Sequence, residues 1–127
     1  VEKRLKKMVL INNDIMEPVF YGNKDCEILI VSWGSTYNTI MEALEKINNK
    51  KIGYLHFIQV YPVHDKIAGY LNKSKTRIII ENNATSQFAK LIKIKTGFEI
   101  ENKILKYSGI YFYVEELIEK IKNITGV

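Results

Sequence analysis

The sequence predicts an α/β protein with a mostly parallel sheet and helices on both faces of that sheet. Short runs of apolar, β-branched residues alternate along the chain with stretches whose apolar residues recur at helical spacing. The strand-like runs are too uniformly apolar to leave one face in water, so helices must cover both faces. With 127 residues, of which 46% are hydrophobic and 26% charged, the chain fits one compact domain.

Composition excludes several classes of protein and of site. The single cysteine, Cys26, forms no internal disulfide and no multi-cysteine zinc or iron–sulfur site, and we interpret it as a packed thiol near a strand. No apolar run approaches the roughly 18 residues that span a bilayer, and no secretory signal is present, so we expect a soluble, cytoplasmic protein without a membrane partner. The net charge is +5, but the lysines are dispersed among other residue types, which predicts no nucleic-acid partner.

The chain begins with a segment that we separate from the domain proper. Apolar residues spaced among lysines over residues 1–11 predict a short amphipathic helix, and we expect residues 1–15 to be an N-terminal helix or linker and residues 16–127 to be the domain. Residues 16–22 then favour a short edge strand, because Pro18 is tolerated at sheet edges and at strand starts.

Residues 27–33 form a continuous apolar run, which predicts a central parallel strand. A turn at Gly34, Ser35 and Thr36 leads into a helix that ends near Asn48. This strand–turn–helix unit then repeats along the chain. Further strands are predicted at 52–58, 76–81 and 103–107, the last suited to an edge, and further helices at about 65–71, 86–95 and 114–124.

Two strand-to-helix loops carry candidate contact residues. Gly34, Ser35 and Thr36 could hold a phosphate on backbone N–H groups, but the G-x-G-x-x-G spacing and the P-loop lysine are missing, so an N-capping turn is the favoured interpretation. Residues 81–87 gather a carboxylate, amides and hydroxyls, among them Asn82, Asn83 and Gln87. These side chains could form turns and caps or contact a ligand or partner, and the sequence leaves both open.

Catalytic and metal sites are not predicted. His56 and His64 have no Cys or His partner at metal-ligand spacing, and no serine stands in a G-x-S-x-G elbow. An aromatic tract at residues 107–113 could bury against a partner.

Four motifs occur together in an order and spacing that resemble a known family. They are IVSWGSTY at 30–37, LHFIQVYP at 55–62, IENNATSQFAKL at 80–91 and ILKYSG at 104–109. The resemblance is to the C-terminal part of the alpha subunit of 2-oxoacid:ferredoxin oxidoreductases, of the 2-oxoglutarate branch, over residues 1–124. It implies a transketolase C-terminal-like domain: a three-layer α/β/α sandwich with about five mostly parallel strands and a short antiparallel edge strand, matched by residues 19–21.

The resemblance also implies a division of labour. The whole enzyme would convert a 2-oxoacid and coenzyme A to an acyl-CoA and carbon dioxide while reducing ferredoxin. Its thiamine diphosphate, magnesium and iron–sulfur cluster would lie in a preceding thiamine-pyrimidine domain and in the beta subunit. This chain would then be a structural and subunit-contact domain, inactive alone, with no catalytic residue, metal or cofactor of its own, and residues 1–15 would link it to the preceding domain.

The strand order implied by the resemblance gives an expectation for the two loops. The strand that ends at Trp33 would neighbour the strand that ends at Glu81, so the turn at 34–36 and the loop residues Asn82, Asn83 and Gln87 would form one polar surface that meets a neighbouring domain or subunit. Two alternatives from other classes are a stand-alone Rossmann-like domain that binds a phosphate-bearing ligand or coenzyme A at these loops, and a basic nucleic-acid module.

Overall fold

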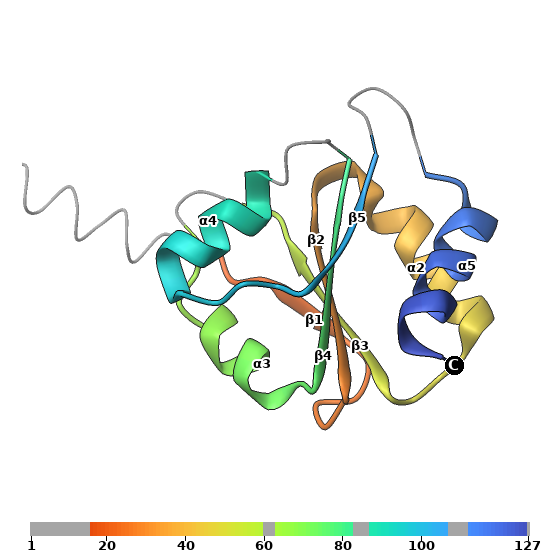
Figure 1. Ribbon diagram of the computed structural model, residues 1–127, viewed down its shortest axis with the longest axis horizontal. Coiled ribbons are helices and arrows are strands. Elements are labelled where there is room, and N and C mark those ends of the chain that lie inside the picture. Colours follow the sequence, from red (N-terminus) through yellow and green to blue (C-terminus); the bar gives the residue numbers. More distant parts are fainter. Residues whose placement is uncertain (1–15, 60–62, 83–86, 107–111, 127) are drawn as a thin grey trace, which may run out of the picture.

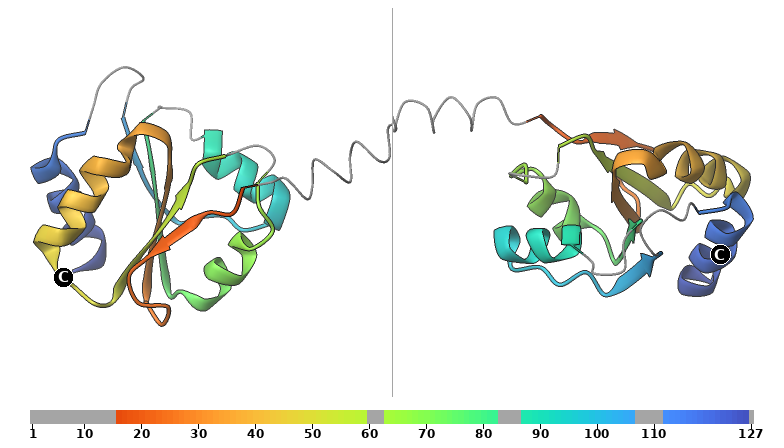
Figure 2. Two further views of the ribbon diagram at one scale, coloured as in Figure 1. Left: turned by 180° about the vertical axis from the view of Figure 1, so that it is seen from behind. Right: turned by 90° about the horizontal axis from the view of Figure 1, so that it is seen from above.

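A five-stranded sheet lies between two pairs of helices in the computed structural model, which describes residues 16–59, 63–82, 87–106 and 112–126 (Figures 1 and 2). The predicted three-layer α/β/α sandwich is therefore confirmed. The segment 1–15, predicted to be a helix or linker, and the candidate residue Asn83 lie outside the described residues.

The strand order is β1-β3-β2-β4-β5. The strands are β1 (Val19–Tyr21), β2 (Ile28–Trp33), β3 (Ile52–Phe57), β4 (Thr76–Glu81) and β5 (Asn102–Leu105). As predicted, β1 is a short antiparallel edge strand, paired with β3, while the other neighbouring strands pair in parallel. The central strand β2 is almost wholly buried, which explains its continuous apolar run.

Helices α2 and α5 pack on one face of the sheet, and α3 and α4 lie on the other (Figure 2). The helices are η1 (Gly34–Thr36, a 3-10 turn), α2 (Tyr37–Ile47), α3 (Ile67–Lys73), α4 (Gln87–Thr96) and α5 (Val114–Thr125). Helix α3 begins two residues later than predicted, because Asp65 and Lys66 form a turn in which the carbonyls of His64 and Asp65 accept the N–H groups of Ile67 and Ala68. Helix α4 ends where predicted, at Gly97, which adopts a φ of 79°.

Alternate residues of each strand feed two separate cores. The α3/α4 core contains Leu29, Val31, Leu55, Phe57, Ile79 and Phe88, among others. The α2/α5 core contains Ile30, Ile40, Tyr54, Ile78, Ile104 and Leu117, among others. Both cores are buried on a sheet whose parallel strands need cover on both sides.

Gly53 allows the edge of the sheet to close. A Cβ at this position would lie 2.6 Å from the Cys26 sulfur and 2.7 Å from the Phe20 ring, closer than real Cβ atoms approach. Burial raises the pKa of the Cys26 thiol, which agrees with its interpretation as a packed side chain. Within the described ranges, no helix is long and apolar enough to cross a membrane.

Candidate functional site

The carboxyl ends of β2 and β4 are adjacent, as the resemblance implied. The chain leaves β2 through α2 toward β3 and leaves β4 through α4 toward β5, so the two crossovers run in opposite directions from this point of the sheet. Such a switch point is where open α/β sheets form a crevice. The loop at Gly34–Thr36 and Asn82 therefore start from neighbouring strands.

The first loop differs from its prediction in one respect. Gly34–Thr36 is a 3-10 turn in which no side chain caps α2, so the predicted N-capping turn is wrong. Thr36 is itself in a helical conformation, and its buried hydroxyl turns back to donate to the Trp33 carbonyl at 3.3 Å. Gly34 has a φ of 75° and open space around it, and Ser35 is exposed. This loop thus presents glycine and serine to the surface and keeps the threonine inside.

The second loop is organised by Glu81. Its buried carboxylate accepts hydrogen bonds from the backbone N–H groups of Phe88 at 2.7 Å and Ala89 at 3.2 Å, so it caps the start of α4. The sequence showed that Glu81 was part of a polar cluster but not that its side chain would bond to the backbone seven residues further along the chain. A carboxylate at a helix N-terminus occupies the place that an anionic ligand would need. Asn82 is half-buried and Gln87 is exposed.

A further charged pair at the same edge was missed by sequence reasoning. Lys106 follows β5, and its ammonium lies 2.6 Å from the Glu116 carboxylate and above the rings of Phe112 and Tyr113, at 5.5 and 5.3 Å from their centroids. The hydrogen bond from Lys106 lowers the pKa of Glu116. Glu116 also accepts the Tyr113 N–H, so the pair ties the end of β5 to the start of α5. No local spacing signals a contact across ten residues and a loop.

A buried polar chain runs along the α2/α5 face. The Tyr54 hydroxyl is hydrogen-bonded to the Ser32 hydroxyl and to Nδ1 of His56, at 2.9 Å in the second case. Burial raises the pKa of Tyr54 and lowers the pKa of His56. The His56 ring also packs against Tyr37 of α2, with centroids 5.0 Å apart. Residues 54 and 56 share a strand face by their spacing, which is the one signal that the sequence offered.

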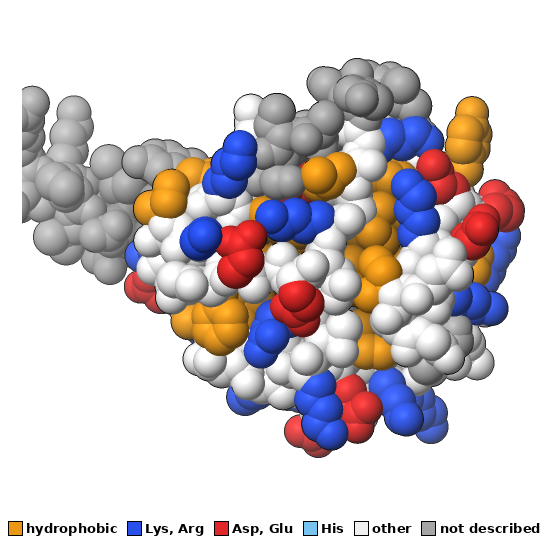
Figure 3. Space-filling view, viewed as in Figure 1, with side chains coloured by type: hydrophobic (Ala, Val, Ile, Leu, Met, Phe, Trp, Pro, Cys, Tyr) orange, Lys and Arg blue, Asp and Glu red, His pale blue; other side chains and the backbone are white. Residues whose placement is uncertain are grey.

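The described residues hold no group of three or more His, Cys, Asp or Glu side chains that could bind a metal ion. Basic and acidic side chains are interspersed on the face that carries β5 (Figure 3). Glu99, for example, lies 3.1 Å from the ammonium of Lys93 and 3.2 Å from that of Lys103. The expectation that the chain has no nucleic-acid partner stays a prediction.

No family model matches the sequence. Two curated relatives are similar over almost the whole chain: the alpha subunit of 2-oxoacid:ferredoxin oxidoreductase 1 from Aeropyrum pernix and the 2-oxoacid:ferredoxin oxidoreductase alpha subunit from Saccharolobus solfataricus. Each is 32% identical and is matched over 97% of this chain and 20% of its own length. The chain therefore spans about a fifth of the length of these relatives.

Two solved structures are also similar. The alpha chain of a probable 2-oxoacid ferredoxin oxidoreductase from Thermoplasma acidophilum is 30% identical, with 87% of this chain and 98% of that chain covered and a TM-score of 0.55. The 2-oxoglutarate:ferredoxin oxidoreductase from Magnetococcus marinus, solved with 2-oxoglutarate, coenzyme A and succinyl-CoA bound, is 19% identical. The match covers 95% of this chain and 22% of that one, and its TM-score of 0.83 shows a similar fold.

Proposed function

The chain belongs to the 2-oxoacid:ferredoxin oxidoreductase alpha-subunit family, and we propose that it is the C-terminal structural and subunit-contact domain of such an alpha subunit. The observation that carries this proposal is the match of 97% of the chain to only 20% of alpha subunits at 32% identity. A match to so small a part of these alpha subunits supports a domain of a larger enzyme. Residues 16–127 would be the domain, and residues 1–15 its link to a preceding one.

The reaction that we propose for the whole, cytoplasmic enzyme is the oxidative decarboxylation of a 2-oxoacid. The 2-oxoacid and coenzyme A give an acyl-CoA and carbon dioxide, and ferredoxin takes up the electrons. We propose 2-oxoglutarate as the 2-oxoacid, because the four sequence motifs resemble that branch of the family. The domain described here contributes a surface and not a chemical step.

Thiamine diphosphate, magnesium and the iron–sulfur cluster are proposed to bind elsewhere in the enzyme, in the thiamine-pyrimidine domain and the beta subunit. The donor set described in this chain does not fit them: no three acidic, histidine or cysteine side chains come together in it, and Cys26 is buried.

The two loops at the switch point are the proposed contact surface with a neighbouring domain or subunit. Its candidate residues are Gly34, Ser35, Asn82, Asn83 and Gln87, whereas Thr36, also a candidate from the sequence, is buried beneath the loop. Adjacent strand ends support this grouping for the described members. Glu81 already accepts hydrogen bonds from the N–H groups at the start of α4, which disfavours the alternative of a phosphate-bearing ligand at that helix. Uncharged amides and hydroxyls suit hydrogen-bonded docking.

The first test is to read the gene upstream of Val1 and then to purify the enzyme that it encodes. The proposal requires an in-frame thiamine-pyrimidine domain, a beta subunit that co-purifies, and reduction of a viologen dye that depends on both 2-oxoglutarate and coenzyme A. A stop codon directly upstream, or a chain that binds coenzyme A tightly by itself in calorimetry, would contradict it.

The contact surface has a separate test in the assembled enzyme. Replacing Asn83 and Gln87 with Ala should weaken subunit association several-fold, because the lost hydrogen bonds lie at the interface, while the melting temperature of the isolated chain stays within about 2 °C. Lys122→Ala on α5 is the matched control. If the double variant unfolds the chain and leaves association intact, these residues are only turn and capping residues.

A further inference from the structure

We propose that a groove between β1 and α2 is a second docking surface, which binds a polypeptide segment from another part of the same oxidoreductase. The source of the segment rests on the function proposed above. The groove has a volume of about 670 Å³ and lies between the end of β1, one side of α2 and the turn that follows α2. Its apolar lining residues are Tyr21, Met41, Leu44 and Ile52.

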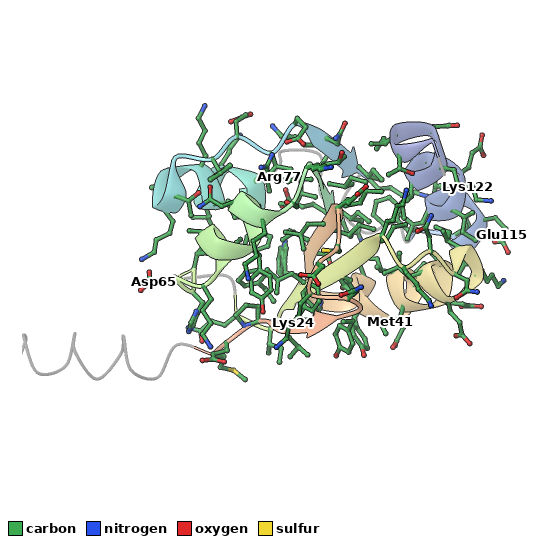
Figure 4. All side chains as sticks on the ribbon, turned by 90° about the horizontal axis from the view of Figure 1, so that it is seen from below. Lys24, Met41, Asp65, Arg77, Glu115 and Lys122 are labelled. Carbon is green, nitrogen blue, oxygen red and sulfur yellow. The ribbon has the colours of Figure 1, made fainter. Side chains whose placement is uncertain are left out.

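The two faces of the β1 strand show why this side is open. On the α3/α4 side, Phe20 stacks on Tyr70 of α3, with ring centroids 5.2 Å apart, so a helix covers the strand. On the other side, Tyr21 contacts the rings of Tyr37 and Tyr54, and beyond them the sheet edge opens into the groove. Figure 4 shows Met41 at the outer edge of the molecule on the α2 side. Met41 and Leu44 are only half-buried there.

The groove is built for an uncharged, hydrogen-bonding occupant. Its charged lining residues are Glu42, Glu45 and Lys50, two carboxylates against one ammonium, which does not favour a phosphate-bearing cofactor. The side-chain amides of Asn38 and Asn48 also line it and make no hydrogen bond to another described residue, while the backbone N–H of Asn48 donates to the Leu44 carbonyl. Asparagine amides both donate and accept, as peptide backbone groups do.

These residues form one stripe along α2. Asn38 lies in the first turn of α2, and Asn48 is the left-handed residue that caps its end, about 15 Å away, with Met41 and Leu44 between them. An apolar centre between hydrogen-bonding ends matches the anatomy of a protein interface, with an apolar core and a polar rim. We therefore infer that the occupant is a protein segment that places apolar side chains against Met41 and Leu44.

The length of the curated relatives supports a protein segment as the occupant of the groove. About four-fifths of each curated alpha subunit lies outside the part that this chain matches. The proposed function places this chain in such a subunit, whose remainder would contact it, and an open apolar groove is the kind of surface on which such contacts form. A second copy of this chain is the competing occupant.

The direct test is site-specific photo-cross-linking in the assembled oxidoreductase. A photoreactive amino acid in place of Met41 should cross-link to a peptide outside residues 1–127, identified by mass spectrometry. The matched control is the same amino acid in place of Ile94, which lies on α4 and is 82% exposed, and which should give at least fivefold less cross-link.

The outcomes separate the groove from the function proposed above. A chain that does not assemble with oxidoreductase subunits overturns both. An assembled, active enzyme in which position 41 cross-links only to a second copy of this chain, or no more than position 94, overturns the groove alone.

A second measurement uses side-chain changes and reports on α2 itself. In the assembled enzyme, Met41→Lys combined with Leu44→Lys should speed hydrogen exchange of the α2 amides at least tenfold, because the bound segment is lost, while the amides of β4 keep their rates. Ile94→Lys should change neither set. Unchanged α2 rates in the double variant would overturn the proposal. Faster exchange in β4 as well would mean that the double variant unfolds the domain. Asn38→Ala, which removes only a side-chain amide, then tests the groove without that unfolding.

Discussion

The two faces of the sheet bury different kinds of side chain. The α3/α4 core is made of aliphatic and aromatic residues, and the buried charge on that face, Glu81, caps a helix. The α2/α5 face instead buries a hydrogen-bonded chain of Ser32, Tyr54 and His56, and it opens into the groove beside β1. Burial of apolar surface on the α3/α4 face stabilises the fold, whereas the hydrogen bonds on the α2/α5 face fix the positions of Ser32, Tyr54 and His56.

This difference predicts where substitutions cost most. A buried apolar side chain loses transfer free energy and leaves a cavity when it is truncated. A buried hydroxyl in a hydrogen-bonded chain contributes less, and an exposed residue of the groove, such as Asn38, contributes little until a partner is bound. For the 127-residue chain, substitution should change stability most at Phe88, then at Glu81 and Tyr54, and least at His56.

Phe88→Ala should lower the free energy of unfolding by about 4 kcal/mol, because this ring is 1% exposed and packs edge-on against Phe57. Urea unfolding measures the change. Ile94→Ala on the same helix is the matched control and should stay within about 0.5 kcal/mol. Equal losses for the two variants would mean that α4 does not pack as described.

Glu81→Ala should lower the free energy of unfolding by about 2–3 kcal/mol, since the buried N–H groups of Phe88 and Ala89 lose a carboxyl acceptor. Glu81→Gln keeps one acceptor oxygen and should lose less. Hydrogen exchange at the two amides, followed by mass spectrometry, should quicken in both variants. A Glu81→Ala variant as stable as the parent would contradict the capping role.

Tyr54→Phe should cost about 1–2 kcal/mol, because it removes the hydroxyl between Ser32 and His56 and leaves a buried polar group unsatisfied. Adding Ser32→Ala to Tyr54→Phe should cost much less than Ser32→Ala does alone, because the partner is already lost. Strictly additive losses would show that the two hydroxyls are not coupled.

The smallest effect is a pH dependence from His56. Burial lowers the pKa of folded His56 below that of the unfolded chain, about 6.5, so the unfolded state binds the proton more readily. The contribution of His56 to the free energy of unfolding is therefore complete above the unfolded-state pKa and falls as the pH is lowered through that pKa. The melting temperature should therefore decrease between pH 7 and pH 5.5, and His56→Gln should flatten the decrease. An unchanged slope in that variant would assign the effect to other groups.

The strands were the most predictable part of the fold. The boundaries of β2 and β4 follow the apolar, β-branched runs to within one residue, because a strand covered on both faces admits little else. The adjacency of the strands that end at Trp33 and Glu81 came from the family's strand order and was confirmed. The role of Asn82, Asn83 and Gln87 as a contact surface stays a prediction.

The α/β class, the number of strands and their approximate ends were determined by the sequence, because local periodicity reports which faces of each element are buried. Only the tertiary structure decided that Glu81 caps α4, that Lys106 pairs with Glu116, and that β1 and α2 leave a groove between them. Each of these depends on residues brought together by the packing of different elements. Such contacts leave no period in the chain, since their spacing is set by the path of the backbone through the sheet and its loops.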